Sequence, residues 1–122
     1  MSEVPINVFL YEDLDRDFVW AERKPAFSNV ARPTVDQIQP IVITTERFEL
    51  IVINDRGNKL KTYLMTVVAP EGGRININVQ SGDEGAEWRS LLRAGELTYR
   101  VICISGTSDR ALFGGPFTIE TR

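Results

Sequence analysis

The 122-residue chain carries 14 basic and 17 acidic side chains, giving a net charge of −3, and 43% of its residues are hydrophobic. This composition predicts one soluble globular domain with a single core, and no apolar run approaches the roughly 20 residues of a membrane-spanning helix. The acidic excess lies within residues 1–24, so the rest of the chain is neutral, which argues against nucleic-acid binding.

Histidine is absent, and Cys103 is the one cysteine. The absence of histidine removes the usual general base for serine or cysteine nucleophiles and the commonest ligand of catalytic zinc. Because Cys103 lies inside a predicted strand, we expect its thiol to be a buried, inert hydrophobe. We therefore predict a non-enzymatic protein with no catalytic residue, cofactor or metal. The first residues do not resemble a secretory signal, so we expect synthesis in the cytoplasm.

Residues 5–11 predict a first strand in which Ile6, Val8 and Leu10 share one face. The following Asp13-x-Asp15-x-Asp17 has the spacing that opens a calcium loop, but Phe18 stands where that loop needs glycine. Lys24 stands where it needs a bidentate glutamate. The pattern therefore predicts a solvated turn, or an acidic contact to a basic partner.

Residues 22–40 show no periodicity and contain Pro25, Pro33 and Pro40. A connection of this length without secondary structure is uncommon in a compact domain and is usually functional or laid over another surface. We therefore divide the chain into residues 1–40, an N-terminal strand and irregular arm, and residues 41–122, the main domain. Deletion of residues 1–24 is expected to leave a folded domain.

Strand patterns begin at residue 41. Residues 41–44 and 48–53 read as strands, a turn at residues 54–58 follows, and residues 60–69 return antiparallel. Residues 74–80 alternate most regularly, with Ile75, Ile77 and Val79 predicted to face the core.

The sequence Ser81-Gly82-Asp83-Glu84 matches a capping box and predicts a short helix. Its apolar stripe is Trp88, Leu91 and Leu92. Residues 97–104 are the best strand in the chain, and we expect them at the centre of a sheet between residues 74–80 and 111–120.

About seven strands with regular turn signals predict an all-β fold, specifically an antiparallel immunoglobulin-like β-sandwich with one short helix and an extended N-terminal arm. An open barrel is the alternative architecture. The polar row Asn76, Asn78 and Gln80, with Trp20, Tyr63 or Trp88 nearby, also leaves a free-standing carbohydrate-binding module as an alternative function.

Residues 74–120 resemble the C-terminal half of small immunoglobulin-like modules of tailed-phage virions, such as the N-terminal domains of upper baseplate proteins. The resemblance is carried by Ala94-Gly95-x-Leu97-x-Tyr99-x-Val101 and by Leu112-Phe113-Gly114-Gly115-x-Phe117-Thr118-Ile119. It implies a structural virion protein, namely a capsid cement or decoration protein that binds neighbouring capsid subunits, or a tail or baseplate component.

Under this interpretation the arm contacts other virion proteins, the chain is a homo-oligomer or part of a symmetric particle, and neither nucleic acid nor membrane is bound. Interface energy is typically concentrated in a few aromatic anchors. The predicted partner-binding residues are therefore the aromatic residues of the N-terminal segment: Phe9, Tyr11, Phe18, Trp20 and Phe27.

Overall fold

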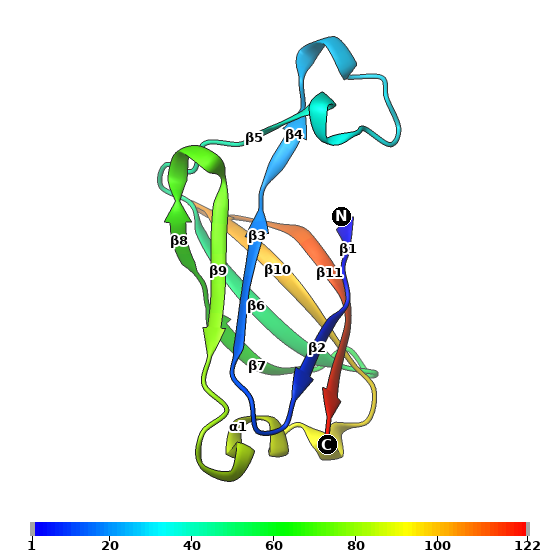
Figure 1. The fold of residues 1–122 in the computed structure, drawn as a ribbon, viewed down its shortest axis with the longest axis vertical. Coiled ribbons are helices and arrows are strands. Elements are labelled where there is room, and N and C mark those ends of the chain that lie inside the picture. The colour runs from blue at the N-terminus through cyan, green and yellow to red at the C-terminus, as the bar shows by residue number, and fades with distance from the viewer. Residues whose placement is uncertain (1, 122) are drawn as a thin grey trace.

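The computed structural model describes residues 2–121 and consists of two packed β-sheets with a small projecting lobe (Figure 1). The larger sheet, sheet A, is built from β1 (Ser2–Glu3), β2 (Ile6–Phe9), β6 (Arg47–Asn54), β7 (Lys59–Leu64), β10 (Leu97–Ser105) and β11 (Ser108–Glu120). Its strand order is β1-β11-β10-β6-β7, with β2 also beside β11. Sheet B contains β3 (Leu14–Val19), β9 (Arg74–Val79) and β8 (Thr66–Ala69) in that order, and β4 (Ala21–Arg23) pairs with β5 (Ile38–Pro40).

Alternating side chains of the two sheets form the core between them. Phe48, Leu50 and Val52 of β6 are buried, as are Tyr99, Val101 and Cys103 of β10. Sheet B contributes Ile75, Ile77 and Val79, as their alternation predicts. The all-β, sandwich-like character of the fold is thereby confirmed.

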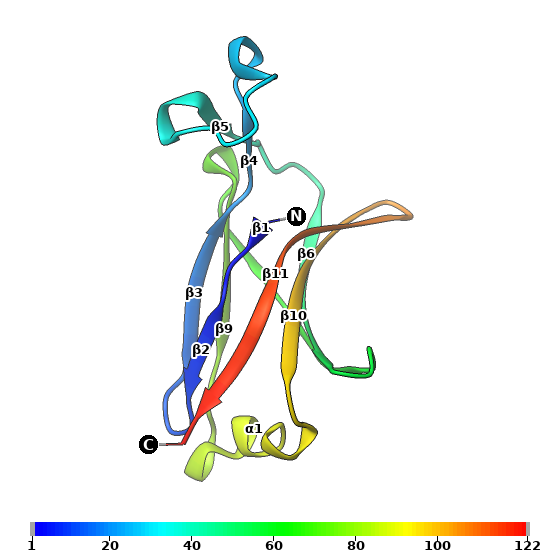
Figure 2. The same cartoon turned by 90° about the vertical axis from the view of Figure 1, so that its right-hand side faces the viewer.

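Strand β10 is central, as expected, but one of its predicted neighbours is wrong. It pairs antiparallel with β11 and β6, whereas β9 lies in sheet B. The reason is the crossing near α1 (Ala86–Arg89), which carries the chain from one sheet to the other at the end of the molecule where both sheets terminate (Figure 2). Trp88 is fully buried there, and its indole N–H donates to the Glu12 carbonyl at 2.8 Å.

The helix is shorter than predicted, and the expected capping box at Ser81 does not form. A 3-10 turn at Asp83–Gly85 precedes α1, and neither element has a side-chain cap. The Ser81 backbone N–H donates instead to the Asp13 carboxylate at 2.8 Å. Gly85 has a φ of +69°, and a Cβ atom there would collide with the Leu10 carbonyl oxygen. The regular helix therefore begins only after this glycine, at Ala86.

Much of the predicted N-terminal arm lies inside the sheets. Strand β2 runs parallel to β11, with Ile6 opposite Phe117, and β3 pairs antiparallel with β9. Ile6, Val8, Leu14 and Phe18 are buried, because these strands carry apolar residues on one face that complete the core. Strands β4 and β5, within residues 21–40, are the part of the predicted arm whose strands lie outside sheets A and B. Deletion of residues 1–24 would remove β1, β2 and β3 from the two sheets, so we now expect it to unfold the domain.

The middle of the chain also differs from the predicted strands. Residues 41–44 form no strand, and the predicted strand 60–69 is divided at the buried Met65, with β7 in sheet A and β8 in sheet B. The hairpin through residues 54–58 is confirmed. A Met side chain in the core at this position anchors the point where the chain changes sheets.

Strand β11 contains Pro116, although proline lacks a backbone N–H and is usually confined to edge strands or strand starts. The structure places it inside the strand, paired with Thr98 on one side. On the other side β1 pairs only up to Gly114 and β2 begins at Phe117, so Pro116 lies opposite the gap between two short strands. A missing N–H donor is tolerated at such an interruption.

Candidate functional site

The lobe (residues 21–40) projects beyond the end of both sheets (Figures 1 and 2). It consists of the β4–β5 ladder and two 3-10 turns, Pro25–Phe27 and Val35–Gln37. None of its residues is buried. Local hydrogen bonds hold it: the Thr34 N–H donates to Gln37 Oε1 at 3.0 Å, and Gln39 Nε2 donates to Glu22 Oε1 at 3.2 Å. The lobe therefore keeps its shape through polar contacts, without a core of its own.

The base of the lobe is fixed to the body through the backbone of Trp20. Its N–H donates to the Gly73 carbonyl at 2.8 Å, and its carbonyl accepts from the Ile41 N–H at 2.8 Å. The indole ring packs edge-on against Phe48, with the ring centroids 5.8 Å apart. Trp20 thus attaches the lobe to the body, because its backbone holds the base of the lobe and its ring packs on the core.

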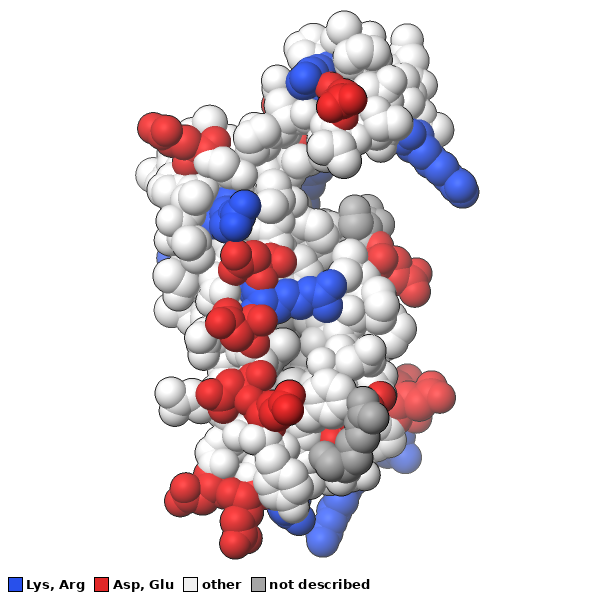
Figure 3. All heavy atoms as spheres, viewed as in Figure 1, with Lys and Arg blue, Asp and Glu red and all other residues white. Residues whose placement is uncertain are grey.

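A cleft of about 590 Å³ lies between the lobe and β11. It is lined by Val19, Trp20, Ala21, Glu22, Arg23, Ala31, Pro33, Ile38, Arg110, Ala111, Leu112 and Phe113, and Figure 3 shows the notch between lobe and body. Apolar side chains thus alternate with charges of both signs. Within residues 2–121, no strand pairs with the lobe-facing edge of β11 before Phe113. An open strand edge beside an apolar wall suits a protein segment as ligand.

The five predicted partner-binding residues are dispersed over the molecule. Trp20 lines the cleft, and Phe27 is a half-buried residue of the lobe. Phe9 is half-buried in β2, and Phe18 is only 5% exposed in the core. Tyr11 is 59% exposed but lies near α1, where its hydroxyl meets Arg89 Nη2 at 3.3 Å. Of the five, Trp20 alone lines the cleft.

Sequence reasoning missed the β11 side of the cleft, formed by Arg110, Ala111 and Leu112. These residues lie in an ordinary strand pattern, and nothing in their local sequence indicates a binding site. Their proximity to the lobe follows only from the pairing of strands distant in sequence.

The aspartates that resemble a calcium loop are engaged with protein groups. Asn76 Nδ2 donates to Asp15 Oδ1 at 2.8 Å and to Asp17 Oδ1 at 2.7 Å, and Asp17 also meets Arg74 at 3.5 Å. Among the described residues, no three His, Cys, Asp or Glu side chains are grouped to hold a metal ion. These contacts join β3 to β9 on the outer face of sheet B.

The features considered for sugar binding do not form one surface. Trp88 is fully buried, and Trp20 packs on the core. The Tyr63 hydroxyl donates to Glu87 Oε2 at 2.7 Å, and burial followed by this bond raises the pKa of Tyr63 above its ordinary value. The polar row of β9 therefore has none of these three rings exposed beside it as a stacking platform.

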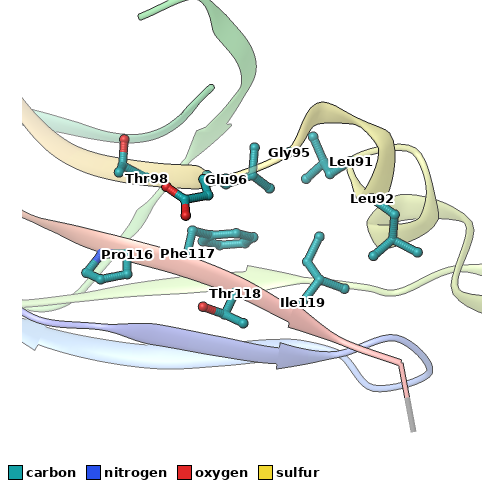
Figure 4. A pocket seen from close by; sticks show the side chains of 10 residues that line it. Leu91, Leu92, Gly95, Glu96, Thr98, Pro116, Phe117, Thr118 and Ile119 are labelled. Atoms are coloured by element: carbon teal, nitrogen blue, oxygen red, sulfur yellow. The ribbon is translucent and has the colours of Figure 1, made fainter. Parts of the chain in front are cut away.

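A second hollow, of about 730 Å³, opens where the chain after α1 passes the ends of β10 and β11. Leu91, Phe117 and Ile119 form its apolar wall, with Glu96 and Thr98 at its rim (Figure 4). Leu91 and Phe117 are almost fully buried, so this wall is the outer side of the core. It has few polar groups to orient a ligand, and we rank it below the cleft.

Cys103 is buried, as predicted, and burial raises the pKa of its thiol. No helix in the part of the chain that the structure describes is long and apolar enough to span a bilayer. The sequence matches no protein-family model, and a comparison with curated proteins finds no match.

Proposed function

We propose that this chain is a non-enzymatic structural module that docks onto another protein through the lobe and the cleft beneath it. The observation that carries the proposal is an ordered 20-residue projection in which no residue is buried. Ordering costs about 1–2 kcal/mol of backbone entropy per residue, and the lobe lacks a core to offset this cost. Val35, in the 3-10 turn Val35–Gln37, is 84% exposed. Docking would bury such apolar groups.

A narrower proposal concerns the partner. The resemblance of residues 74–120 to immunoglobulin-like modules of tailed phages favours a virion protein, and within that class a capsid cement or decoration protein rather than a tail or baseplate component. The strand order supports an immunoglobulin-like topology, because β11-β10-β6-β7 and β3-β9-β8 follow the orders G-F-C-C′ and B-E-D of variable-type sandwiches. The N-terminal strands differ in lying beside β11 rather than β3.

The lobe can be removed without cutting a strand of sheet A or sheet B. Glu22 and Gln39 are direct partners in the β4–β5 ladder, so an Asn-Gly turn joining them would replace residues 23–38 with a two-residue hairpin. We expect this variant to keep the circular dichroism spectrum of the whole protein. It should fail to co-sediment with phage particles purified from the lysate of cells that produce the protein.

A matched control is Asn78→Ala, an exposed position on sheet B outside the lobe and the cleft. This variant should co-sediment as the unaltered protein does. Co-sedimentation of the shortened variant at unchanged affinity would refute the docking role of the lobe. If the unaltered protein does not co-sediment with particles, the virion assignment fails. If it does co-sediment, electron microscopy of particles carrying the labelled protein shows whether it is bound to the capsid or to the tail.

A further inference from the structure

The outer face of sheet A carries branched aliphatic residues, and no further layer of the described chain lies over this face (Figure 2). Since Tyr99, Val101 and Cys103 point inward, the alternate β10 residues point outward: Thr98, Arg100, Ile102 and Ile104. The same alternation directs Glu49, Ile51 and Ile53 of β6 outward, although Ile51 is only 7% exposed. Figure 2 shows sheet A with the body on one side and no further layer on the other.

Strand register gathers these residues into one patch. Ile102 lies opposite Glu49, and Arg100 lies opposite Ile51. On the far side of β6, Leu64 lies opposite Glu49 and is 74% exposed. The aliphatic patch is defined as Ile51, Ile53, Leu64, Ile102 and Ile104, with Glu49 and Arg100 among them.

The outer face of sheet B has the opposite character. Its side chains satisfy one another, since Asn76 bonds Asp15 and Asp17, and Arg74 pairs with Asp17. Figure 3 shows charged side chains along this face. A hydrated face whose charges pair with one another needs no partner. An aliphatic patch in which Leu64 is 74% exposed and Ile53, Ile102 and Ile104 are half-buried is typical of an interface.

Two charges in the patch await partners. Glu49 is half-buried and Arg100 is exposed, and among the described residues neither side chain makes a hydrogen bond or ion pair. Arg100 and Ile102 of β10 form a square with Glu49 and Ile51 of β6. Arg100 and Glu49 stand at the ends of one diagonal of this square, and Ile51 and Ile102 stand at the ends of the other. A partner that covers the patch must therefore bring one acid and one base at this spacing, because an unpaired buried charge is costly.

We propose that a second copy of this chain covers the patch, packing sheet A against sheet A about a two-fold axis along the Ile51–Ile102 diagonal. Such an axis places Ile51 and Ile102 against their own counterparts. It also brings Arg100 next to Glu49 of the partner subunit, and the reciprocal pair follows from the symmetry. An isologous interface needs this self-complementarity, and the arrangement of one acid and one base across a diagonal supplies it.

The size of the patch sets the expected affinity. The patch lies on β6, β7 and β10. Three strands about 4.8 Å apart, each contributing about seven residues of about 3.4 Å, give an area of roughly 340 Å² per subunit. Side-chain relief raises the accessible area above this value, toward the low end of specific interfaces, which bury about 800 Å² per partner. Interfaces of this class reach micromolar affinity at their weak end, so the dimer should dominate at about 100 µM.

Sedimentation equilibrium of the whole protein tests the proposal. At about 100 µM the unaltered chain should sediment with twice its mass of 13.8 kDa. Ile102→Asp places an unpaired carboxylate at the centre of the interface and should raise the dimer dissociation constant about 100-fold. Asn78→Asp, which adds the same charge to the outer face of sheet B, is the matched control and should leave the constant unchanged. A monomeric unaltered chain, or equal losses in the two variants, would overturn the proposal.

Charge exchange provides a second readout that does not depend on the folding of Ile102→Asp. Arg100→Glu and Glu49→Arg should each raise the dissociation constant about 10-fold, because each places like charges together across the axis. The double variant should recover most of the affinity, and failure to recover it would refute the proposed axis. The variant with the shortened lobe should still dimerise, so this result is independent of the docking role of the lobe.

Discussion

Phe18 and Phe27 were both expected to be partner-binding aromatics, and the structure separates them. Phe18 is 5% exposed, with its ring centroid 5.1 Å from that of Phe113 and 6.2 Å from that of Tyr99. The Arg16 guanidinium also lies 5.5 Å from the Phe18 ring centroid. Phe27 is a half-buried residue in a lobe without buried side chains. Truncation of each to alanine should therefore have very different costs.

Phe18→Ala removes a core ring and leaves a cavity between the sheets, which typically costs about 3–5 kcal/mol. That loss is a large fraction of the total stability of about 5–15 kcal/mol expected of a domain, and it should lower Tm by roughly 10–25 °C. Phe27→Ala should cost less than about 1 kcal/mol.

Urea unfolding followed by circular dichroism measures both values, with an unchanged m-value as the check that the unfolding transition is comparable. A loss below about 1 kcal/mol for Phe18→Ala, or equal losses for the two variants, would show that β3 does not contribute to the core as described.

Two further predictions follow from the core and from the pair at α1. Val101→Asp buries an unpaired carboxylate at a fully buried position of β10 and should leave little folded protein by circular dichroism. Asn78→Ala should lower the free energy of unfolding by well under about 1 kcal/mol. Equal effects of the two variants would mean that the strand register is wrong. The free energy of unfolding should fall as pH rises above about 10, because the unfolded chain releases the Tyr63 proton that the folded chain, with its raised Tyr63 pKa, retains. Tyr63→Phe should flatten this decline in urea titrations at successive pH values, whereas an unchanged slope would contradict burial of the hydroxyl against Glu87.

Features that depend on neighbouring residues were predictable from the sequence. The alternation of Ile75, Ile77 and Val79 defines which face of β9 is buried, because side chains of a strand alternate whatever its partner is. The turn at residues 54–58 and the burial of Cys103 follow from equally local patterns. The exposed lobe was anticipated in part, since a proline-rich, aperiodic segment cannot form a core strand.

Sheet membership could be decided only by the tertiary structure. Backbone hydrogen bonds form the same ladder with any neighbouring strand, so the pattern of β9 does not state whether it lies beside β10 or across the core from it. The same limit applies to Phe18, whose burial depends on β3 pairing with residues 74–79.

The candidate sites depend on long-range register for the same reason. Arg110 and Leu112 reach the cleft only because the lobe folds back toward β11. Likewise, the aliphatic patch exists because β6 and β10, some 50 residues apart in sequence, align Glu49 with Ile102 and Ile51 with Arg100. Each of these strands by itself shows only an ordinary mixture of isoleucine and charge. A shift of one residue in their pairing would turn a strand's outward residues toward the core, so the surface is a property of the pairing and not of either segment.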